Sequence, residues 1–519
     1  MDQDQGSEMT AAETAQSAEA GRNDIAIVGM ACRLPGGIET PEQLWQVLAA
    51  GESVVGTFPA SRREWPSADE FPGIDRGGFV ADGDAFDAAF FRMSPAEARL
   101  TDPQQRMLLE LSFACLEDAG ILPAALKGTN AGVFVGASTC DYSRLVQEAG
   151  VEVEPHHGVG SSLAVIANRV SYFFDLSGPS LVVDTACSSS LVALHSAVQS
   201  LRAGECSAAL VGGVNLICHP DLSIAYHKAG MLSPDGRCKV FDASANGYVR
   251  SEGAVVLLLK PLRAAIADAN HIHAVIRGSA INHGAWRSPR TTAVRASSSH
   301  AGGLTVPDPR KQKELLLAAW KDAAISADEL SYIEAHGTGT TVGDPIEIQG
   351  IKAAYAELGS TQPSASCAIG SVKSNVGHLE SAAGITGLLK ILLALRHRQL
   401  PASIHFEQLN PKILLNDTPL FIQDRLREWE SDRLRIAAVS SFGSGGTNAH
   451  VVLQEYASGA KPSPAEEQYL FVLSAADDDR LRAQASRVID WLERDGTADN
   501  FGDAIFTWQT GRVAMPQRL

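Results

Sequence analysis

Short apolar runs alternate with helical patterns along most of this chain. The first run, residues 25–29, ends in glycine and is typical of a buried strand. Similar strand-like runs recur as far as about Glu455, and the clearest are residues 131–136, 181–184, 208–211, 254–259, 332–335 and 451–453. This alternation predicts an α/β fold in which sheets and helices form layers.

Both ends of the chain depart from this pattern. Residues 1–23 are polar and acidic and lack the features of a secretion signal, which predicts a disordered leader before Asp24. Residues 458–464 are rich in Pro, Ser and Lys and are typical of a linker. An apolar run and two helical stretches follow, so residues 458–519 are predicted to form a small separate unit. The chain stops without a terminating signal, which suggests a piece of a longer polypeptide.

The composition is that of a soluble globular protein. Of 519 residues, 45% are hydrophobic and 20% charged, and no apolar run is long enough to cross a membrane. The net charge of −17 argues against nucleic acid and anionic membranes as partners, and a phosphate partner would need a local basic patch. The eight cysteines show no CxxC pair and no zinc spacing to histidine, which favours reduced thiols in the cytoplasm and no metal site.

Cys187 lies between a predicted strand and a predicted helix. Residues 181–183 are apolar before it, and leucines and a valine recur at helical spacing after it. A helix start carries partial positive charge and free N–H groups, so we expect it to favour the thiolate and lower the pKa of Cys187. Small neighbours would let a substrate approach, and the Cys187 N–H could face a developing oxyanion. The alternative is a buried structural cysteine.

Two histidines make the catalytic interpretation of Cys187 stronger. His336 follows a predicted strand and enters a Gly/Thr loop, and His378 lies in a second strand-to-loop segment before a long apolar helix. An imidazole can donate from one nitrogen while a partner orients the other. A hydrogen-bonded structural histidine is the alternative for each taken singly. Lys373 follows an apolar strand, which favours a buried ion pair over a surface lysine.

A glycine-rich loop at residues 442–448 is the fourth candidate segment. Its glycines allow close backbone approach, and N–H groups in such a loop can bind an anion or oxyanion. It lacks the GxxxxGK[ST] pattern and a strand follows it, which argues against a phosphate-binding loop. The run at residues 29–37 lacks GxGxxG spacing, which argues against a dinucleotide site.

Together, four motifs resemble those of the β-ketoacyl synthase family of the thiolase superfamily. They occur in the family's order: DTACSSS at 184–190, EAHGTGT at 334–340, KSNVGHLE at 373–380 and SSFGSGGTNAH at 440–450. The opening IAIVGMACRLPGG and the run DPQQRMLLE resemble ketosynthase domains of modular polyketide synthases. The resemblance implies a thiolase-like α/β/α/β/α fold, with residues 24–270 carrying the nucleophile, 271–457 the histidines, and 458–519 a flanking linker subdomain.

The resemblance also implies roles for single residues. Cys187 matches the family's nucleophile, His336 and His378 its two catalytic histidines, and Lys373 its lysine. The backbone N–H groups of Cys187 and Ser444 match the oxyanion hole. These residues imply a ketosynthase that accepts an acyl chain on the cysteine and condenses it with a malonyl thioester, releasing carbon dioxide.

Further residues match positions that bind the substrate. Thr338 and Thr340 match those that hydrogen-bond the phosphopantetheine arm. Phe442 is also expected to bind substrate or pantetheine, and Ser444 matches the position that gates the acyl pocket. Many relatives have a bulky aromatic residue at position 444, and serine there resembles synthases of the trans-acyltransferase type. The segment 285–304 is longer than the family pattern, and we expect a mobile loop or a partner contact.

The family resemblance implies partners as well. Acyl carrier proteins would deliver both the acyl and the malonyl group on phosphopantetheine, the domain would bind no cofactor or metal of its own, and it would form a homodimer. Three alternatives stay open: a gatekeeper that transfers acyl groups without condensing them, a Cys/His thioester hydrolase, and an inactive docking module. The acyl chain, the final product and the module position do not follow from the residues.

Overall fold

The computed structural model describes residues 24–60, 62, 65–284, 306–359, 366–458, 468–494 and 496–519. The predicted leader and the segment 285–304 lie outside these residues. None of the described helices is long and apolar enough to cross a membrane.

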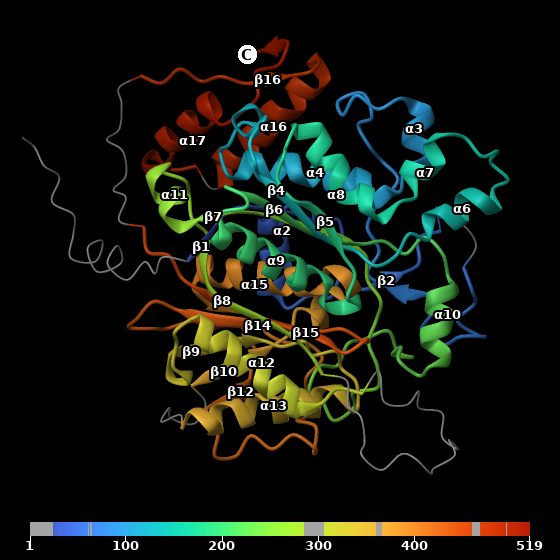
Figure 1. The fold of residues 1–519 in the computed structure, drawn as a ribbon, viewed down its shortest axis with the longest axis vertical. Coiled ribbons are helices and arrows are strands. Elements are labelled where there is room, and N and C mark those ends of the chain that lie inside the picture. Colours follow the sequence, from blue (N-terminus) through green and yellow to red (C-terminus); the bar gives the residue numbers. More distant parts are fainter. Residues whose placement is uncertain are drawn as a thin grey trace, which may run out of the picture.

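An eleven-stranded sheet organises the chain (Figure 1). Its strands, from one edge to the other, are β12 (Leu420–Ile422), β10 (Cys367–Gly370), β9 (Leu330–Glu334), β14 (Ile436–Phe442), β15 (Thr447–Gln454), β8 (Ala274–His283), β1 (Ile25–Arg33), β7 (Gly253–Pro261), β6 (Ala209–Asn215), β4 (Gly132–Gly136) and β5 (Ser180–Val183). All seven strand-like runs predicted from the sequence fall within or overlap these strands, with ends shifted by a few residues.

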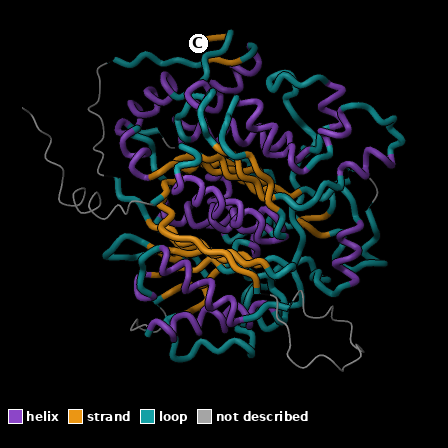
Figure 2. Tube along the Cα trace, viewed as in Figure 1, coloured by secondary structure: helices purple, strands orange, loops and turns teal. Residues whose placement is uncertain are grey.

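The sheet forms two layers that enclose a pair of helices (Figure 2). The layers join where β1 pairs with β8 over Ile25–Ile27 only. The enclosed helices are α9 (Ser189–Ala203) and α15 (Ala383–His397). The first thirteen residues of α15 are all buried, as expected for a helix that is apolar on nearly every side.

Helices also cover the outer faces of both layers, which completes the predicted α/β/α/β/α arrangement (Figure 1). On the side of β4 and β6 lie α4 (Pro103–Asp118) and α8 (Leu163–Phe174), and on the side of β9 and β10 lie α12 (Pro309–Asp322) and α13 (Gly343–Leu358).

The remaining elements are short or lie at the periphery. The helices are α2 (Pro41–Ala50), α3 (Pro95–Leu100), α5 (Pro123–Leu126), α6 (Tyr142–Glu148), α7 (His156–Gly160), α10 (Asp221–Lys228), α11 (Leu262–Ala267) and α14 (Lys373–Val376), with 3₁₀ turns η1 (Ala186–Ser188), η2 (Ala327–Glu329) and η3 (Glu380–Ala382). Three two-stranded pairs are β2 (Gly56–Thr57) with β3 (Arg76–Gly77), β11 (Gln399–Leu400) with β13 (Arg427–Glu428), and β16 (Ser474–Ala475) with β17 (Gln517–Arg518).

The C-terminal segment packs beside α4 as α16 (Asp478–Arg494) and α17 (Ala498–Thr510) (Figure 1). Arg512 Nη1 donates to the carbonyl of Glu117 at 2.7 Å, and Arg480 pairs with Asp87 at 3.2 Å. Contacts of this kind attach the segment to the larger part of the chain.

Candidate active site

Cys187 lies in η1, between the end of β5 and the start of α9. The preceding residue, Ala186, has φ +55°, a left-handed conformation that is strained for a residue with a Cβ atom. Side chains hold this turn: Asp184 accepts the Ala186 N–H at 3.0 Å, and Ser189 Oγ accepts the Thr185 N–H at 2.9 Å. The nucleophile candidate therefore lies on a strained and well-supported turn.

The end of β14 and the glycine-rich loop that follows it pack directly on this turn. Ser441 Oγ donates to the carbonyl of Cys187 at 2.7 Å. A Cβ atom at Gly443 would lie 2.1 Å from the carbonyl oxygen of Thr185, so only glycine permits this approach. The backbone N–H groups of Ser444 and Cys187 both lower the pKa of the Cys187 thiol, so both lie near its sulfur. Two backbone donors thus converge where a thioester oxygen could lie.

The predicted lowering of the Cys187 pKa is wrong. Burial raises the pKa of the Cys187 thiol to about 12, and the negative charge of Glu380 raises it further. Lys373 and the backbone donors at Ser444 and Cys187 lower it, but these effects are smaller than that of burial. At neutral pH the resting cysteine is therefore a thiol.

His336 follows β9, and its ring is held by the glycine-rich loop. The backbone N–H of Phe442 donates to Nδ1 of His336 at 3.4 Å. Burial, followed by the positive charge of Lys373, lowers the pKa of His336 well below its ordinary value. A neutral ring whose Nδ1 accepts a hydrogen bond carries its proton on Nε2. His336 is thus a donor through Nε2.

His378 has the same protonation for a parallel reason. The backbone N–H of Glu380 donates to Nδ1 of His378 at 3.0 Å, and burial followed by Lys373 and Arg250 lowers the pKa of the ring well below its ordinary value. The rings of His336 and His378 lie 5.5 Å apart and nearly perpendicular. The structure therefore brings together two neutral imidazoles that each donate through Nε2.

Lys373 is buried behind the histidines. Its ammonium donates to the carbonyl of His336 at 2.5 Å, and burial lowers its pKa while Glu334 and Glu347 oppose this effect through their charges. The sequence favoured a buried ion pair. Within the described residues, however, no carboxylate lies within ion-pair distance of Lys373, because the two glutamates are held by other donors.

Three acidic residues that support the site escaped the sequence analysis. Glu347 accepts the N–H groups of His336 and Gly337 at 2.7 and 2.8 Å, and Asp344 accepts those of Thr338 and Gly339 at 3.0 and 3.1 Å. Burial raises the pKa of Glu347 to about 7 and that of Asp344 to about 6. The signal was available: both acids occur in the first turn and a half of the helix after the Gly/Thr loop.

The third is Glu334, two residues before His336. It accepts the N–H of Val372 at 2.5 Å and the hydroxyl of Tyr332 at 2.6 Å, and it pairs with the fully buried Lys390 of α15 at 3.0 Å. Nothing local in the sequence predicts that a lysine in an apolar helix meets this glutamate.

The remaining predicted residues lie around the histidines. The ring of Phe442 is 5.5 Å from that of His336, and the hydroxyls of Thr338 and Thr340 lie 3.2 Å apart on the loop that follows His336. Ser444 is exposed at the tip of the glycine-rich loop. Among the described residues, no group of three or more His, Cys, Asp or Glu side chains could hold a metal ion.

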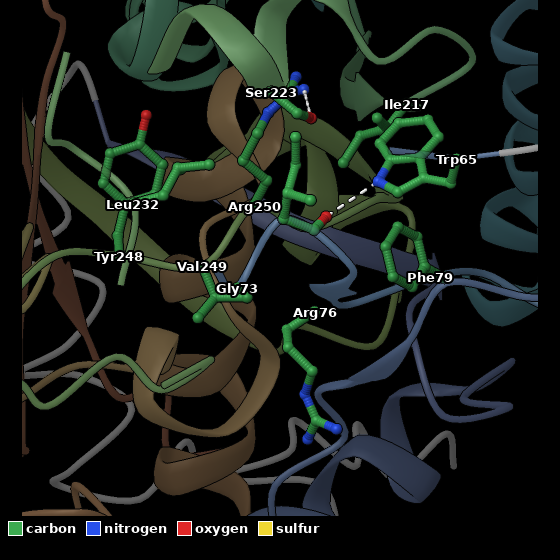
Figure 3. Close-up of a pocket in the computed structure, with 11 residues that line it drawn as sticks. Trp65, Gly73, Arg76, Phe79, Ile217, Ser223, Leu232, Tyr248, Val249 and Arg250 are labelled. Carbon is green, nitrogen blue, oxygen red and sulfur yellow. Dashed lines mark hydrogen bonds between the residues drawn. The ribbon is translucent and has the colours of Figure 1, made fainter. Parts of the chain in front are cut away.

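Behind His378 lies a buried ion pair that the sequence did not indicate. Arg250 and Glu380 form a two-point contact, at 2.5 and 2.9 Å. Figure 3 shows the hydrogen bond between Arg250 and Ser223, and the ring of Tyr248 lies 5.0 Å from that of His378.

This arrangement combines a thiol nucleophile, two neutral imidazole donors and two backbone donors. Such a set can take an acyl group onto sulfur and stabilise negative charge on a thioester oxygen.

Comparisons with known proteins agree with this chemistry. The family described as "Beta-ketoacyl synthase, N-terminal domain" matches residues 22–265, the "Beta-ketoacyl synthase, C-terminal domain" matches 273–407, and the "Ketoacyl-synthetase C-terminal extension" matches 410–518. The chain is 42% identical to Polyketide synthase PksM of Bacillus subtilis over 525 residues, covering 95% of this chain and 12% of PksM. It is also 44% identical to Polyketide synthase ThaG of Burkholderia thailandensis over 517 residues, covering 95% of this chain and 9% of ThaG.

Solved structures are similar over nearly the whole chain. A ketosynthase from module 6 of the bacillaene synthase of Bacillus subtilis is 38% identical with a TM-score of 0.84, covering 95% of this chain and 81% of that one. The oxazolomycin ketosynthase domain OzmH KS7 of Streptomyces albus is 39% identical with a TM-score of 0.87, covering 96% and 85%. These similarities confirm the predicted thiolase-like fold.

Proposed function

This chain belongs to the β-ketoacyl synthase family, as a ketosynthase of the polyketide synthase type, and we propose that it condenses an acyl chain held on Cys187 with a malonyl thioester. Ketosynthases of this type are acyltransferases that catalyse Claisen condensation of acyl and malonyl units on acyl carrier protein. The chain spans only a small part of the curated relatives, 12% in the case of PksM, so its own substrates and partners belong to this proposal.

In the first step, Cys187 takes the acyl group from an upstream acyl carrier protein. The sulfur forms a bond to the thioester carbon, the bond to the pantetheine sulfur breaks, and the thiol proton passes to the departing pantetheine thiolate. The N–H groups of Cys187 and Ser444 are the donors for the tetrahedral oxyanion, which is supported by their lowering effect on the pKa of the Cys187 thiol.

In the second step, a malonyl carrier protein loses carbon dioxide. The electron pair of the broken bond passes into an enolate, whose thioester oxygen accepts hydrogen bonds from Nε2 of His336 and His378. The α-carbon then attacks the acyl carbon, the Cys187 sulfur leaves as a thiolate and takes up one proton from water, and a β-ketoacyl carrier protein is formed. Neutral Nε2 donors suit this role because negative charge develops in front of them.

Lys373 supports the second step without touching substrate. Together with burial, which is the larger effect, its charge lowers the pKa of both histidines, and its hydrogen bond to the His336 carbonyl fixes that segment. Thr338 and Thr340 are proposed to hydrogen-bond the pantetheine arm, and Phe442 and Ser444 to form the entrance of the acyl pocket. No metal or redox cofactor takes part in either step.

Two finer assignments extend the proposal. The small side chain of Ser444 supports a synthase of the trans-acyltransferase type, in which a wide entrance accepts substituted acyl chains; antibiotic biosynthesis fits this type. Eight free cysteines support a reducing, cytoplasmic location.

The domain is further proposed to form a homodimer through β5. This strand is the edge of the eleven-stranded sheet, and Leu181 on it is 46% exposed. An exposed apolar edge strand is a ready site for pairing with a second copy. Because Cys187 lies four residues after β5, such pairing would stabilise the turn that carries the nucleophile.

The observation that carries the proposal is that Ser441 and Phe442 of β14 connect the Cys187 turn with His336, whose ring lies 5.5 Å from that of His378. The test offers a panel of acyl thioesters to the domain and measures the mass of the intact protein, then adds malonyl carrier protein and measures the product. We expect acyl mass on the wild-type protein and none on Cys187→Ala. His378→Ala should still be acylated but should condense at least about 100-fold more slowly, as when an oxyanion donor is removed.

The same measurement separates the alternatives. Acyl transfer without any condensation by the wild-type protein would indicate a gatekeeper. Free acid without a malonyl requirement would indicate a hydrolase, and the absence of acylation would leave only a docking role. Continued elongation by His378→Ala would contradict the division of labour between the two steps.

A further inference from the structure

The conformation of Glu380 is unusual. Its φ is +48°, in the left-handed region that residues with a Cβ atom rarely adopt. This conformation accompanies the hydrogen bond from the Glu380 N–H to Nδ1 of His378, at 3.0 Å. A strained backbone persists only where other contacts hold it in place.

Arg250 supplies those contacts. Its Nε donates to Oε1 of Glu380 at 2.5 Å and its Nη2 donates to Oε2 at 2.9 Å, a two-point geometry that fixes the orientation of the carboxylate. The side chain of Arg250 is 4% exposed and that of Glu380 11%, so water competes little for either group.

The same arginine lies on the segment that holds the backbone of His378. The N–H of His378 donates to the carbonyl of Val249 at 2.7 Å, and the N–H of Ser251 donates to the carbonyl of His378 at 2.9 Å. The backbone on either side of Arg250 thus fixes the main chain of His378, while the Arg250 side chain fixes the residue that orients its ring.

The remaining donor of Arg250 ties this pair to α10. Nη1 donates to Ser223 Oγ at 2.7 Å, and the guanidinium lies 5.3 Å from the centre of the Tyr226 ring (Figure 3 shows Ser223 and Arg250). The cavity beside Arg250 has a volume of only about 10 Å³, room for about one water molecule. The Arg250 side chain therefore has little space beside it in which to move away from Glu380.

We propose that the Arg250–Glu380 ion pair is the positioning element of His378: it holds Glu380 in the left-handed conformation that caps Nδ1, so that Nε2–H faces the malonyl thioester. This inference rests on the proposed function, because it assigns the ion pair to the decarboxylating step and not to acylation. Neither residue touches substrate, and both act through His378.

The principal variant is Glu380→Gln, which keeps the size of the side chain and removes its charge. Arg250 then loses its two-point acceptor, and the strained backbone loses its support. We expect condensation to slow by about 100-fold, the loss typical of a misplaced catalytic group. Acylation should not slow, because removal of the negative charge of Glu380 favours the Cys187 thiolate.

A matched control breaks a comparable ion pair outside the site. Arg435 Nη1 contacts both carboxylate oxygens of Glu455 at 3.1 and 2.9 Å, and both side chains are 11% exposed. This pair lies at the end of β14 opposite Phe442. We expect Glu455→Gln to leave the ratio of condensation to acylation unchanged, whatever it does to thermal stability.

A second measurement uses the wild-type protein, in case Glu380→Gln does not fold. Histidine labelled with ¹⁵N reports which ring nitrogen carries the proton, and a His378→Asn spectrum identifies the signals of residue 378. We expect Nε2 protonated and Nδ1 free at neutral pH. A proton on Nδ1, or a charged ring, would overturn the proposal.

The kinetic outcomes separate this inference from the function on which it rests. Wild-type protein that neither acylates nor condenses would refute the proposed function. The positioning role alone would be refuted if the wild-type protein condenses and Glu380→Gln condenses equally fast. It would also be refuted if Glu380→Gln slows acylation and condensation to the same extent.

Discussion

The pKa of Cys187 is set by two opposing influences. Nearby hydrogen-bond donors and a positive charge favour the thiolate, whereas desolvation and a negative charge favour the thiol. The backbone N–H groups and Lys373 act in the first direction, and burial and Glu380 act in the second. Burial is the largest of these effects. A thiolate that leaves water loses more hydration free energy than the few nearby partial charges restore. The resting nucleophile is therefore protonated, and its proton must leave during acylation.

This protonation state predicts how the rate of alkylation depends on pH. With a Cys187 pKa of about 12, the thiolate fraction rises about tenfold for each pH unit below that value. The rate of iodoacetamide labelling at Cys187, followed by the mass of the intact protein, should rise in this way from neutral pH into the alkaline range. A plateau near neutral pH would show that the helix start and Lys373 outweigh burial.

At the scale of elements, the end of β14, where the glycine-rich loop begins, connects the turn that carries Cys187 with the ring of His336. Ser441 contacts the Cys187 turn, and the next residue, Phe442, donates to His336. One stretch of β14 therefore sets the distance between the nucleophile and an imidazole. The close approach at Gly443 is the condition for this arrangement.

Gly443→Ala should separate these segments. Its Cβ would lie 2.1 Å from the Thr185 carbonyl, so the loop must move, at a cost of about 1–3 kcal/mol in unfolding free energy. We expect lower thermal stability and loss of both acylation and condensation. Gly445→Ala is the matched control, because a Cβ there meets nothing within 4 Å. Equal effects of the two substitutions would contradict the argument.

The central helix α15 contains one charge in an apolar environment. Lys390 is 0% exposed and pairs with Glu334 at 3.0 Å. Lys390→Met should lower the free energy of unfolding by about 3–5 kcal/mol, because Glu334 would stay buried without a counter-charge. Denaturant unfolding measures this loss. The double variant Lys390→Met with Glu334→Gln should recover part of it, and no recovery would indicate that lost packing is the cause.

At the scale of the whole molecule, the strand that leads to the nucleophile lies at the edge of the sheet. In a single copy of the chain, β5 is therefore stabilised by pairing on one side alone. It leads into the turn that carries Cys187, yet β4 is its only neighbour within the eleven-stranded sheet. Pairing of two copies at this edge would bury exposed apolar surface and brace the nucleophile.

Leu181→Lys should therefore weaken the proposed dimer. A lysine on an edge strand opposes pairing, because its charge would have to leave water. Sedimentation of the wild-type protein should give the mass of two chains. The variant should have a higher dissociation constant, so it should be monomeric at concentrations at which the wild-type protein is still dimeric. A wild-type monomer, or a variant dimer of equal affinity, would place the interface elsewhere.

The sequence by itself determined the local features of this protein. Alternating apolar runs marked the strands and an almost wholly apolar stretch marked the enclosed helix. The segments around Cys187, His336, His378 and Ser444 implied a thioester-transfer site through their resemblance to β-ketoacyl synthase motifs. These features depend on neighbours within one element, and a linear pattern contains that information.

Only the tertiary structure decided the properties that depend on distant segments. Desolvation by the surrounding segments raises the pKa of the Cys187 thiol, against the expectation from its helix start. Glu380 meets Arg250 across 130 positions of sequence, and Lys373 meets a carbonyl where a carboxylate was expected. The physical reason is that desolvation and ion pairing depend on the complete surroundings of a group, which the chain assembles only when its two sheet layers close around the central helices.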